Sequence, residues 1–253
     1  MVQLFKYSMR PLITALRTLT RIPVPGTDAI SLAAALPYFP AVGLLIGAIT
    51  AGILYGASLS GWAGGSGTVA MIAVVWLTRG LHVDGLADVA DAMGAGRTRE
   101  RRLEIMKDPH MGAFGVMAIV ADLLLKAAAL THLAALNQWI LVILPFIISR
   151  SAQVLLVVSL PYARREGGKA GPFVDHARIL HFVLAVVTAL IFCGTLAGLT
   201  GIILLIQGLL AAILLRLWMK HHFGGITGDL LGMSNELIET SLLAFLAFIS
   251  PTV

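Results

Sequence analysis

Long apolar stretches follow one another along most of this chain, and they constrain its fold more than any other feature. A helix that spans a bilayer needs about 20 largely apolar residues. The stretches of that kind are 38–59, 66–79, 112–130, 138–160, 180–198, 200–217 and 237–250, of which the second and the last are short. The sequence therefore predicts an all-α, polytopic membrane bundle with about seven transmembrane helices.

Composition supports a single integral membrane domain over 1–253. The chain is 58% hydrophobic and 12% charged, whereas soluble domains carry about 25% charged residues. Its one cysteine, Cys193, lies in an apolar run, so no disulfide framework is expected. The net charge of +5 is better explained by topology than by nucleic-acid binding, because basic residues mark the cytoplasmic side of membrane proteins.

Charge in the connecting segments orients the predicted spans. All Lys and Arg residues except Lys126 and Arg150 fall in 1–37, 79–111, 161–179 and 216–236. The other connections, 60–65, 131–137 and 198–201, carry no Asp, Glu, Lys or Arg. This pattern predicts a cytoplasmic N-terminus and an odd number of crossings. No cleavable signal peptide is expected.

Residues 1–30 form a basic segment. On a helix, Lys6, Arg10, Arg17 and Arg21 fall within an arc of about 60°, opposite the leucines of 12–19. The pattern predicts an amphipathic helix on the inner membrane surface, interrupted or restarted at Pro11 and ended by the prolines of 22–25. A charged tail that only sets the topology is an equal alternative.

A ladder of aspartates is the strongest chemical signal. Asp84, Asp88 and Asp91 stand at i, i+4 and i+7 and share one helix face. Three unpaired carboxylates near a membrane are costly unless a cation lies between them. Oxygen ligands suit Mg²⁺ or Mn²⁺, and Mg²⁺ commonly bridges carboxylates and substrate phosphates. The alternative is a solvated acidic face balanced by the arginines of 97–102.

A glycine-rich loop at 224–228 precedes Asp229 on the same predicted membrane side. Glycines and a threonine ahead of a helix let backbone N–H groups approach an anion, and Asp229 would then hold a metal that bridges it. The alternative makes Asp229 a helix N-cap. Asp108 has the same two readings, metal ligand or N-cap of the third span, and His110 either binds phosphate or faces water.

Two predicted spans contain charged residues. Asp122 and Lys126 are four apart in one helix and are expected to neutralise each other. Arg150 has no partner within its own span, so it is either a structural counter-ion or a diphosphate ligand at the inner mouth of the bundle.

Several motifs together resemble one family. They are Arg-Ile-Pro-Val-Pro at 21–25, Phe-Pro-Ala-Val-Gly at 39–43, Gly-Leu-His-Val-Asp-Gly-Leu-Ala-Asp at 80–88, Leu-Glu-Ile-Met-Lys-Asp at 103–108 and Gly-Gly-Ile-Thr-Gly-Asp at 224–229. In this order they resemble the cobalamin synthase family, the adenosylcobinamide-GDP ribazoletransferases. The sequence departs from the family pattern at Arg79, usually a glycine, at 109–111, where His110 stands in place of an arginine, and at 168–170.

The resemblance implies a reaction and its site. A hydroxyl of α-ribazole or α-ribazole 5′-phosphate attacks the cobinamide-side phosphorus of adenosylcobinamide-GDP, and GMP leaves. Displacements of this kind depend on positioning and charge neutralisation. The expected catalytic residues are Asp84, Asp88, Asp91 and Asp229, with Asp88 or Asp91 as the base. The same four with Asp108 are the expected metal ligands. Substrate binding is expected from His82, Lys107, His110, Arg150, Gly225, Thr227, Gly228 and Glu236.

Two other functions are less well matched. A CDP-alcohol phosphotransferase acting on lipid has the signature Asp-x-x-Asp-Gly-x-x-Ala-Arg and two later aspartates at a fixed spacing. Here Ala92 follows Asp91, Arg97 is displaced from Ala95, and no later aspartate pair has that spacing. A cation transporter usually places its acids near the bilayer midplane, whereas these gather at the inner edge. We therefore expect an enzyme of a bacterial or archaeal inner membrane with its active site facing the cytoplasm. Membrane lipid is an expected partner, and neighbouring cobalamin-assembly enzymes and an oligomeric state are compatible with this reading.

Overall fold

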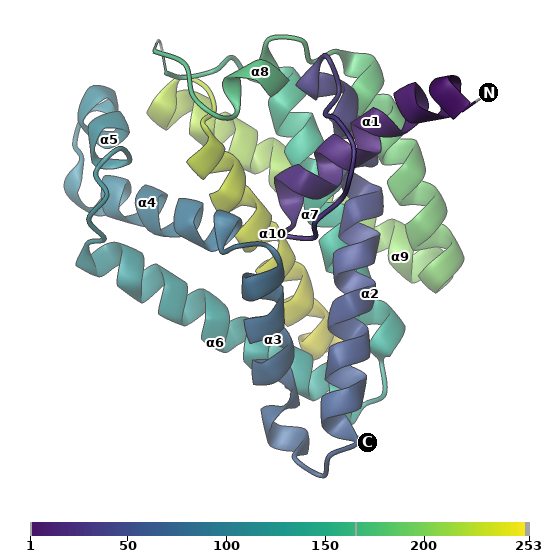
Figure 1. Ribbon diagram of the computed structural model, residues 1–253. Coiled ribbons are helices and arrows are strands. Elements are labelled where there is room, and N and C mark those ends of the chain that lie inside the picture. The colour runs from purple at the N-terminus through teal and green to yellow at the C-terminus, as the bar shows by residue number, and fades with distance from the viewer. Residues whose placement is uncertain (1, 165, 251–253) are drawn as a thin grey trace.

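The computed structural model describes residues 2–164 and 166–250, and it is a bundle of helices (Figure 1). No β-strand occurs in these ranges; Tyr162 and Ile226 form an isolated parallel bridge. The α-helices are α1 Val2–Leu19, α2 Phe39–Ser58, α3 Ser66–Leu77, α4 Leu81–Ala95, α5 Arg99–Ile105, α6 Ala113–Ala135, α7 Trp139–Ser159, α8 Gly171–Val174, α9 Ile179–Phe223 and α10 Gly228–Ile249, with 3-10 turns η1 Leu32–Tyr38 and η2 Ala63–Gly65. The predicted all-α membrane class is confirmed. The predicted single domain 1–253 includes residues 1, 165 and 251–253, which lie outside the described residues.

Among the described residues, five helices are long and apolar enough to cross a membrane, or six if the bent pair α3 and α4 counts as one span. One of the five, α9, has non-helical backbone at Ala197 and Gly198. A Cβ on Gly201 would lie 2.1 Å from the carbonyl oxygen of Cys193, so the two arms of α9 fold back on each other. Each of the seven predicted spans thus coincides with a helix or a helix arm. The number of crossings stays a prediction, because α3 has only 12 residues.

The centre of the bundle is α7, most of which is buried. Gly43 and Gly47 of α2 let that helix pack against its backbone: a Cβ on Gly43 would lie 2.3 Å from the carbonyl oxygen of Phe146. Small residues four apart are typical of close helix contacts in membranes, where packing replaces the hydrophobic effect as the main driving force.

The uncharged connections lie together at one end of the bundle. Asn137 and Gln138 of the α6–α7 turn line one groove with Ala197 and Thr200 of the α9 break. Ser250, at the end of α10, bonds to Gln138 at the same place. At the other end are α1, α5 and α8 (Figure 1). The described charged loops are therefore separated from the uncharged ones, as the topology prediction requires.

The N-terminal segment differs from expectation in one respect. The helix α1 continues through Pro11 and ends at Leu19, before the prolines of 22–25. Arg17 turns back to bond the carbonyl oxygens of Val24 and Gly26, which fixes the loop after the helix. The side chains of residues 1–8, including Lys6, lie outside the described part, so the basic inner-surface face stays a prediction.

Candidate functional site at the charged end of the bundle

The aspartate ladder lies on α4, which leaves α3 through a sharp turn. The two helices meet at 90°, and both Arg79 and Gly80 at the corner have left-handed backbone, with φ of 58° and 65°. A non-glycine residue is strained there. The Arg79 guanidinium offsets this by bonding the carbonyl oxygens of Arg17 and Thr20 at the end of α1. The turn sends α4 across the bundle, with its ladder facing α10 and α6.

Close packing of α4 on α10 brings the two predicted acidic regions together. A Cβ on Gly85 would lie 2.5 Å from the carbonyl oxygen of Asp229, so only glycine allows this crossing. Partial burial, with the carboxylates of Asp229 and Asp84 nearby, raises the pKa of Asp88 to about 7. Asp84, Asp88 and Asp229 therefore lie around one helix crossing, and we call these three residues the acidic cluster.

The third rung of the ladder has a different environment. Asp91 is buried, and its carboxylate accepts hydrogen bonds from the backbone N–H groups of Gly112 (2.7 Å) and Gly115 (2.8 Å). These N–H groups open α6, where a negative charge is favoured. Asp91 thus anchors the start of α6, and its predicted role in catalysis stays a prediction.

Both N-cap alternatives from the sequence are wrong. The N-cap of α6 is Gly112, not Asp108. The N-cap of α10 is Thr227, whose hydroxyl accepts from Leu230 N–H at 3.2 Å, and Asp229 lies within the first turn. The Asp229 carboxylate is therefore not occupied in capping its own helix.

The glycine-rich loop is shaped by a neighbouring chain segment. Ala163 N–H donates to the Ile226 carbonyl at 2.8 Å, and Ile226 N–H donates to the Pro161 carbonyl at 2.9 Å. A Cβ on Gly225 would lie 2.2 Å from that Pro161 oxygen. This close approach accounts for Gly225 without any anion. The phosphate-binding roles expected for Gly225, Thr227 and Gly228 remain predictions.

The same pairing brings Arg164 to the acidic cluster. Its guanidinium donates to Asp229 Oδ2 at 2.6 Å and to the Met106 carbonyl at 3.3 Å. Sequence reasoning missed Arg164 because 65 residues separate it from Asp229 and no spacing pattern links the two. Its place in a basic loop on the same predicted membrane side was the only available signal.

Lys107, Asp108 and His110 lie on an exposed loop beside this region. Lys107 pairs with Glu166 at 2.8 Å, and Asp108 Oδ1 bonds the backbone and ring nitrogens of His110. The Arg164 guanidinium contacts the start of this loop through its hydrogen bond to the Met106 carbonyl. The roles predicted for Lys107, Asp108 and His110 toward metal or phosphate stay predictions.

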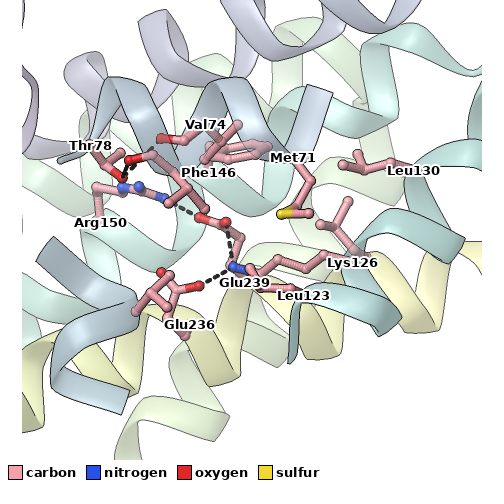
Figure 2. A pocket seen from close by; sticks show the side chains of 13 residues that line it. Met71, Val74, Thr78, Leu123, Lys126, Leu130, Phe146, Arg150, Glu236 and Glu239 are labelled. Carbon is pink, nitrogen blue, oxygen red and sulfur yellow. Dashed lines mark hydrogen bonds and ion pairs between the residues drawn. The ribbon is translucent and has the colours of Figure 1, made fainter. Parts of the chain in front are cut away.

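Two residues expected to bind substrate lie instead inside the bundle. Arg150 is 1% exposed and its guanidinium pairs with Glu239, while Glu236 is 4% exposed and pairs with Lys126. For Arg150 the structure supports the counter-ion alternative. Asp122 also has more partners than predicted: it lies 3.5 Å from Lys126 and accepts from Thr240. Figure 2 shows most of this group, which we call the buried ion cluster, namely Asp122, Lys126, Arg150, Glu236 and Glu239.

The buried ion cluster borders a small cavity and His82. The cavity measures about 10 Å³, room for about one water molecule. His82 is 2% exposed, and neither ring nitrogen has a hydrogen-bond partner. Its Nδ1 lies 4.0 Å from Glu236 Oε1. His82 therefore faces the interior rather than the acidic cluster, and its predicted substrate contact is not supported.

The acidic cluster fits a hard divalent cation by donor chemistry. Carboxylate oxygens are the ligands that Mg²⁺ and Mn²⁺ prefer, and Mg²⁺ keeps waters and substrate phosphates in its shell. Within residues 2–164 and 166–250 no group of three or more His, Cys, Asp or Glu side chains is already arranged as a metal site. Any cation here would need water or substrate oxygens to complete its coordination.

Fold and site together define a polytopic membrane protein with an acidic site at the charged end of its helix bundle. The family model for cobalamin-5-phosphate synthase matches residues 11–247. The chain belongs to this family.

Curated relatives agree with the family match. The chain is 44% identical over 234 residues (91% of this chain, 94% of the relative) to an adenosylcobinamide-GDP ribazoletransferase of Chlorobium phaeobacteroides. It is 41% identical to that of Chlorobaculum tepidum (91% and 92%) and 38% identical to that of Syntrophobacter fumaroxidans (91% and 95%). No solved structure matches the chain.

Proposed function

We propose that this chain is an adenosylcobinamide-GDP ribazoletransferase, acting in the final assembly of the cobalamin nucleotide loop. The proposal rests on the family match and on relatives of that name that cover nearly the whole chain. The structural observation that supports it is the meeting of Asp229 with Asp84 and Asp88 at the α4–α10 crossing. Acids far apart in sequence thus lie at one crossing, where a cation could neutralise the charge of a diphosphate.

The reaction exchanges one phosphorus–oxygen bond for another. A ribose hydroxyl of α-ribazole, or of its 5′-phosphate, forms a bond to the cobinamide-side phosphorus, the bond to GMP breaks, and the hydroxyl proton passes to a base. Asp88 suits the base better than Asp91, because both oxygens of Asp91 already accept backbone N–H groups. Asp84, Asp88 and Asp229 would hold Mg²⁺ or Mn²⁺, which supplies charge neutralisation at the diphosphate.

The direct test is product formation by the purified full-length protein in detergent. With adenosylcobinamide-GDP, α-ribazole 5′-phosphate and Mg²⁺, we expect GMP and the joined cobamide phosphate in equal amounts, measured by liquid chromatography. Omission of α-ribazole 5′-phosphate should abolish GMP release. Release of CMP from a CDP-alcohol with a lipid acceptor, without GMP release, would support the lipid alternative instead.

We propose that the active site faces the cytoplasm of a bacterial or archaeal cell, across the inner membrane. The proposal is supported by the separation of charged from uncharged connections at opposite ends of the bundle. Single cysteines test it in a Cys193→Ala background. An impermeant thiol reagent added to intact cells should label Gly64→Cys and Ala135→Cys but not Ala95→Cys or Lys169→Cys. These positions suit the test because Gly64, Ala95, Ala135 and Lys169 are all exposed. The reverse pattern would overturn the orientation.

A further inference from the structure

Arg164 is positioned differently from the other paired cations of this protein. Within the described ranges, its contact with Asp229 is the only ion pair made by a member of the acidic cluster. Its side chain is 16% exposed, against 1% for Arg150. Its Nε is buried and has no hydrogen-bond partner. Arg164 therefore lies at the edge of the site, with donor capacity that its present contacts do not use.

The segment that carries Arg164 is held in place independently of the ion pair. The two backbone hydrogen bonds to Ile226 hold residues 161–163, and the Arg99 guanidinium donates to the Ala163 carbonyl at 3.4 Å. The guanidinium can thus turn about its own side-chain bonds without unfolding the loop. An ion pair that only closed the loop would duplicate contacts that are already present.

The charge balance of the site changes when substrate arrives. Without a cation, the Arg164 guanidinium lies 2.6 Å from Asp229 Oδ2, and Asp84 and Asp88 are the other acids of the cluster. A divalent cation held partly by Asp229 would neutralise the carboxylate that Arg164 now contacts through Oδ2 and so weaken that ion pair. A diphosphate brings negative charge to that point, and the planar guanidinium matches phosphate oxygens in a bidentate manner.

We propose that Arg164 is an exchangeable counter-ion: it holds Asp229 in the metal-free protein and binds a phosphate of the diphosphate substrate once a cation occupies the acidic cluster. This inference rests on the proposed function for the identity of the diphosphate. Competition between Arg164 and a cation for Asp229 does not depend on that identity, nor does binding of a diphosphate group as such.

The test compares Arg164→Gln with the parent, using Arg101→Gln as a control for the loss of one positive charge. The side chain of Arg101 forms an exposed ion pair with Glu104, away from the acidic cluster. Thermal unfolding is followed in detergent against Mg²⁺, with and without inorganic pyrophosphate. We expect Arg164→Gln to reach half-maximal stabilisation by Mg²⁺ at a severalfold lower concentration, because the competing guanidinium is gone. The additional stabilisation by pyrophosphate should be lost.

In turnover, the KM of Arg164→Gln for adenosylcobinamide-GDP should rise by roughly tenfold or more, as expected for a lost charge-assisted hydrogen bond. Arg164→Lys should recover part of this loss, and Arg101→Gln should match the parent.

The outcomes separate the possible roles of Arg164. If it only fastens the loop, Arg164→Gln will melt at a lower temperature with an unchanged Mg²⁺ midpoint and an unchanged pyrophosphate effect, and the proposal fails. It also fails if the parent shows no stabilisation by Mg²⁺. If the parent releases no GMP yet the two thermal effects appear as expected, the proposed function fails and the exchange of Arg164 stands.

Discussion

Asp88→Asn is expected to remain folded and to lose GMP release by about 100-fold or more, the size of effect seen when a key electrostatic group is removed from an active site. Asp88 is half-buried beside Asp84 and Asp229. Its replacement removes both a cation ligand and the proposed base in one change. The measurement is the rate of GMP release at saturating substrate.

A stability measurement separates this loss from misfolding. Removal of one charge from a set of like charges relieves repulsion, so without Mg²⁺ Asp88→Asn should melt at the parent's temperature or slightly above it. With Mg²⁺ the parent should gain stability and the variant should gain much less, because ligand binding stabilises the state that binds. Full activity in a well-folded Asp88→Asn protein would exclude Asp88 from the site.

Asp91→Asn provides a matched control on the same helix face. Asp91 satisfies two N–H groups of α6, and loss of a buried partner costs about 1–3 kcal/mol. This variant should therefore melt lower than Asp88→Asn while retaining more activity per folded molecule. An equal effect of the two substitutions on activity and stability would show that the ladder acts as one unit.

Lys126→Met should lower the stability of the protein strongly. Lys126 is 5% exposed and contacts Glu236, Glu239 and Asp122. With Lys126 removed, three buried acids would have Arg150 as their one remaining cation in the cluster. Breaking a buried ion pair in this way costs about 3–5 kcal/mol. Thermal unfolding in detergent micelles should report it as a large fall in melting temperature.

A compensating change tests the cause of this loss. Glu236→Gln removes one of the unpaired acids, so Lys126→Met combined with Glu236→Gln should be more stable than Lys126→Met alone. Residues of one network give such non-additive effects. Equal melting temperatures for the parent and Lys126→Met would show that the buried ion cluster contributes nothing to the fold.

The sequence was sufficient for the class of fold and for the meeting of the acidic regions. Hydropathy identifies membrane helices well because the bilayer permits few other structures, and each predicted stretch coincides with a helix or a helix arm. The sequence places Asp229 and Asp84 on the same predicted membrane side, which allows them to share one site. That inference required topology alone, and the Gly85–Asp229 packing agrees with it.

The partners of charged groups were beyond sequence reasoning. Helical spacing identified Asp122 and Lys126, four residues apart, but Lys126 also pairs with Glu236, 110 residues away. Arg150 and Glu239 are 89 residues apart. Spacing rules describe neighbours on one helix, whereas a helix bundle pairs residues of different helices. For the same reason, spacing rules do not identify Arg164. The cap alternatives for Asp108 and Asp229 are wrong because the N-caps of the two helices are Gly112 and Thr227.

The short helix α3 has a consequence for the membrane itself. Twelve residues rise about 18 Å, well short of the hydrocarbon thickness of about 30 Å. The helix α3 ends at Leu77, and the chain then turns aside into α4 and its aspartates. If α3 crosses the membrane, the bilayer beside it would be thinner, or headgroups and water would reach deeper there than elsewhere around the protein. Such hydrophobic mismatch carries a cost that depends on lipid length. At the proposed site, bilayer thickness would then help to set the depth at which substrates reach the acidic cluster.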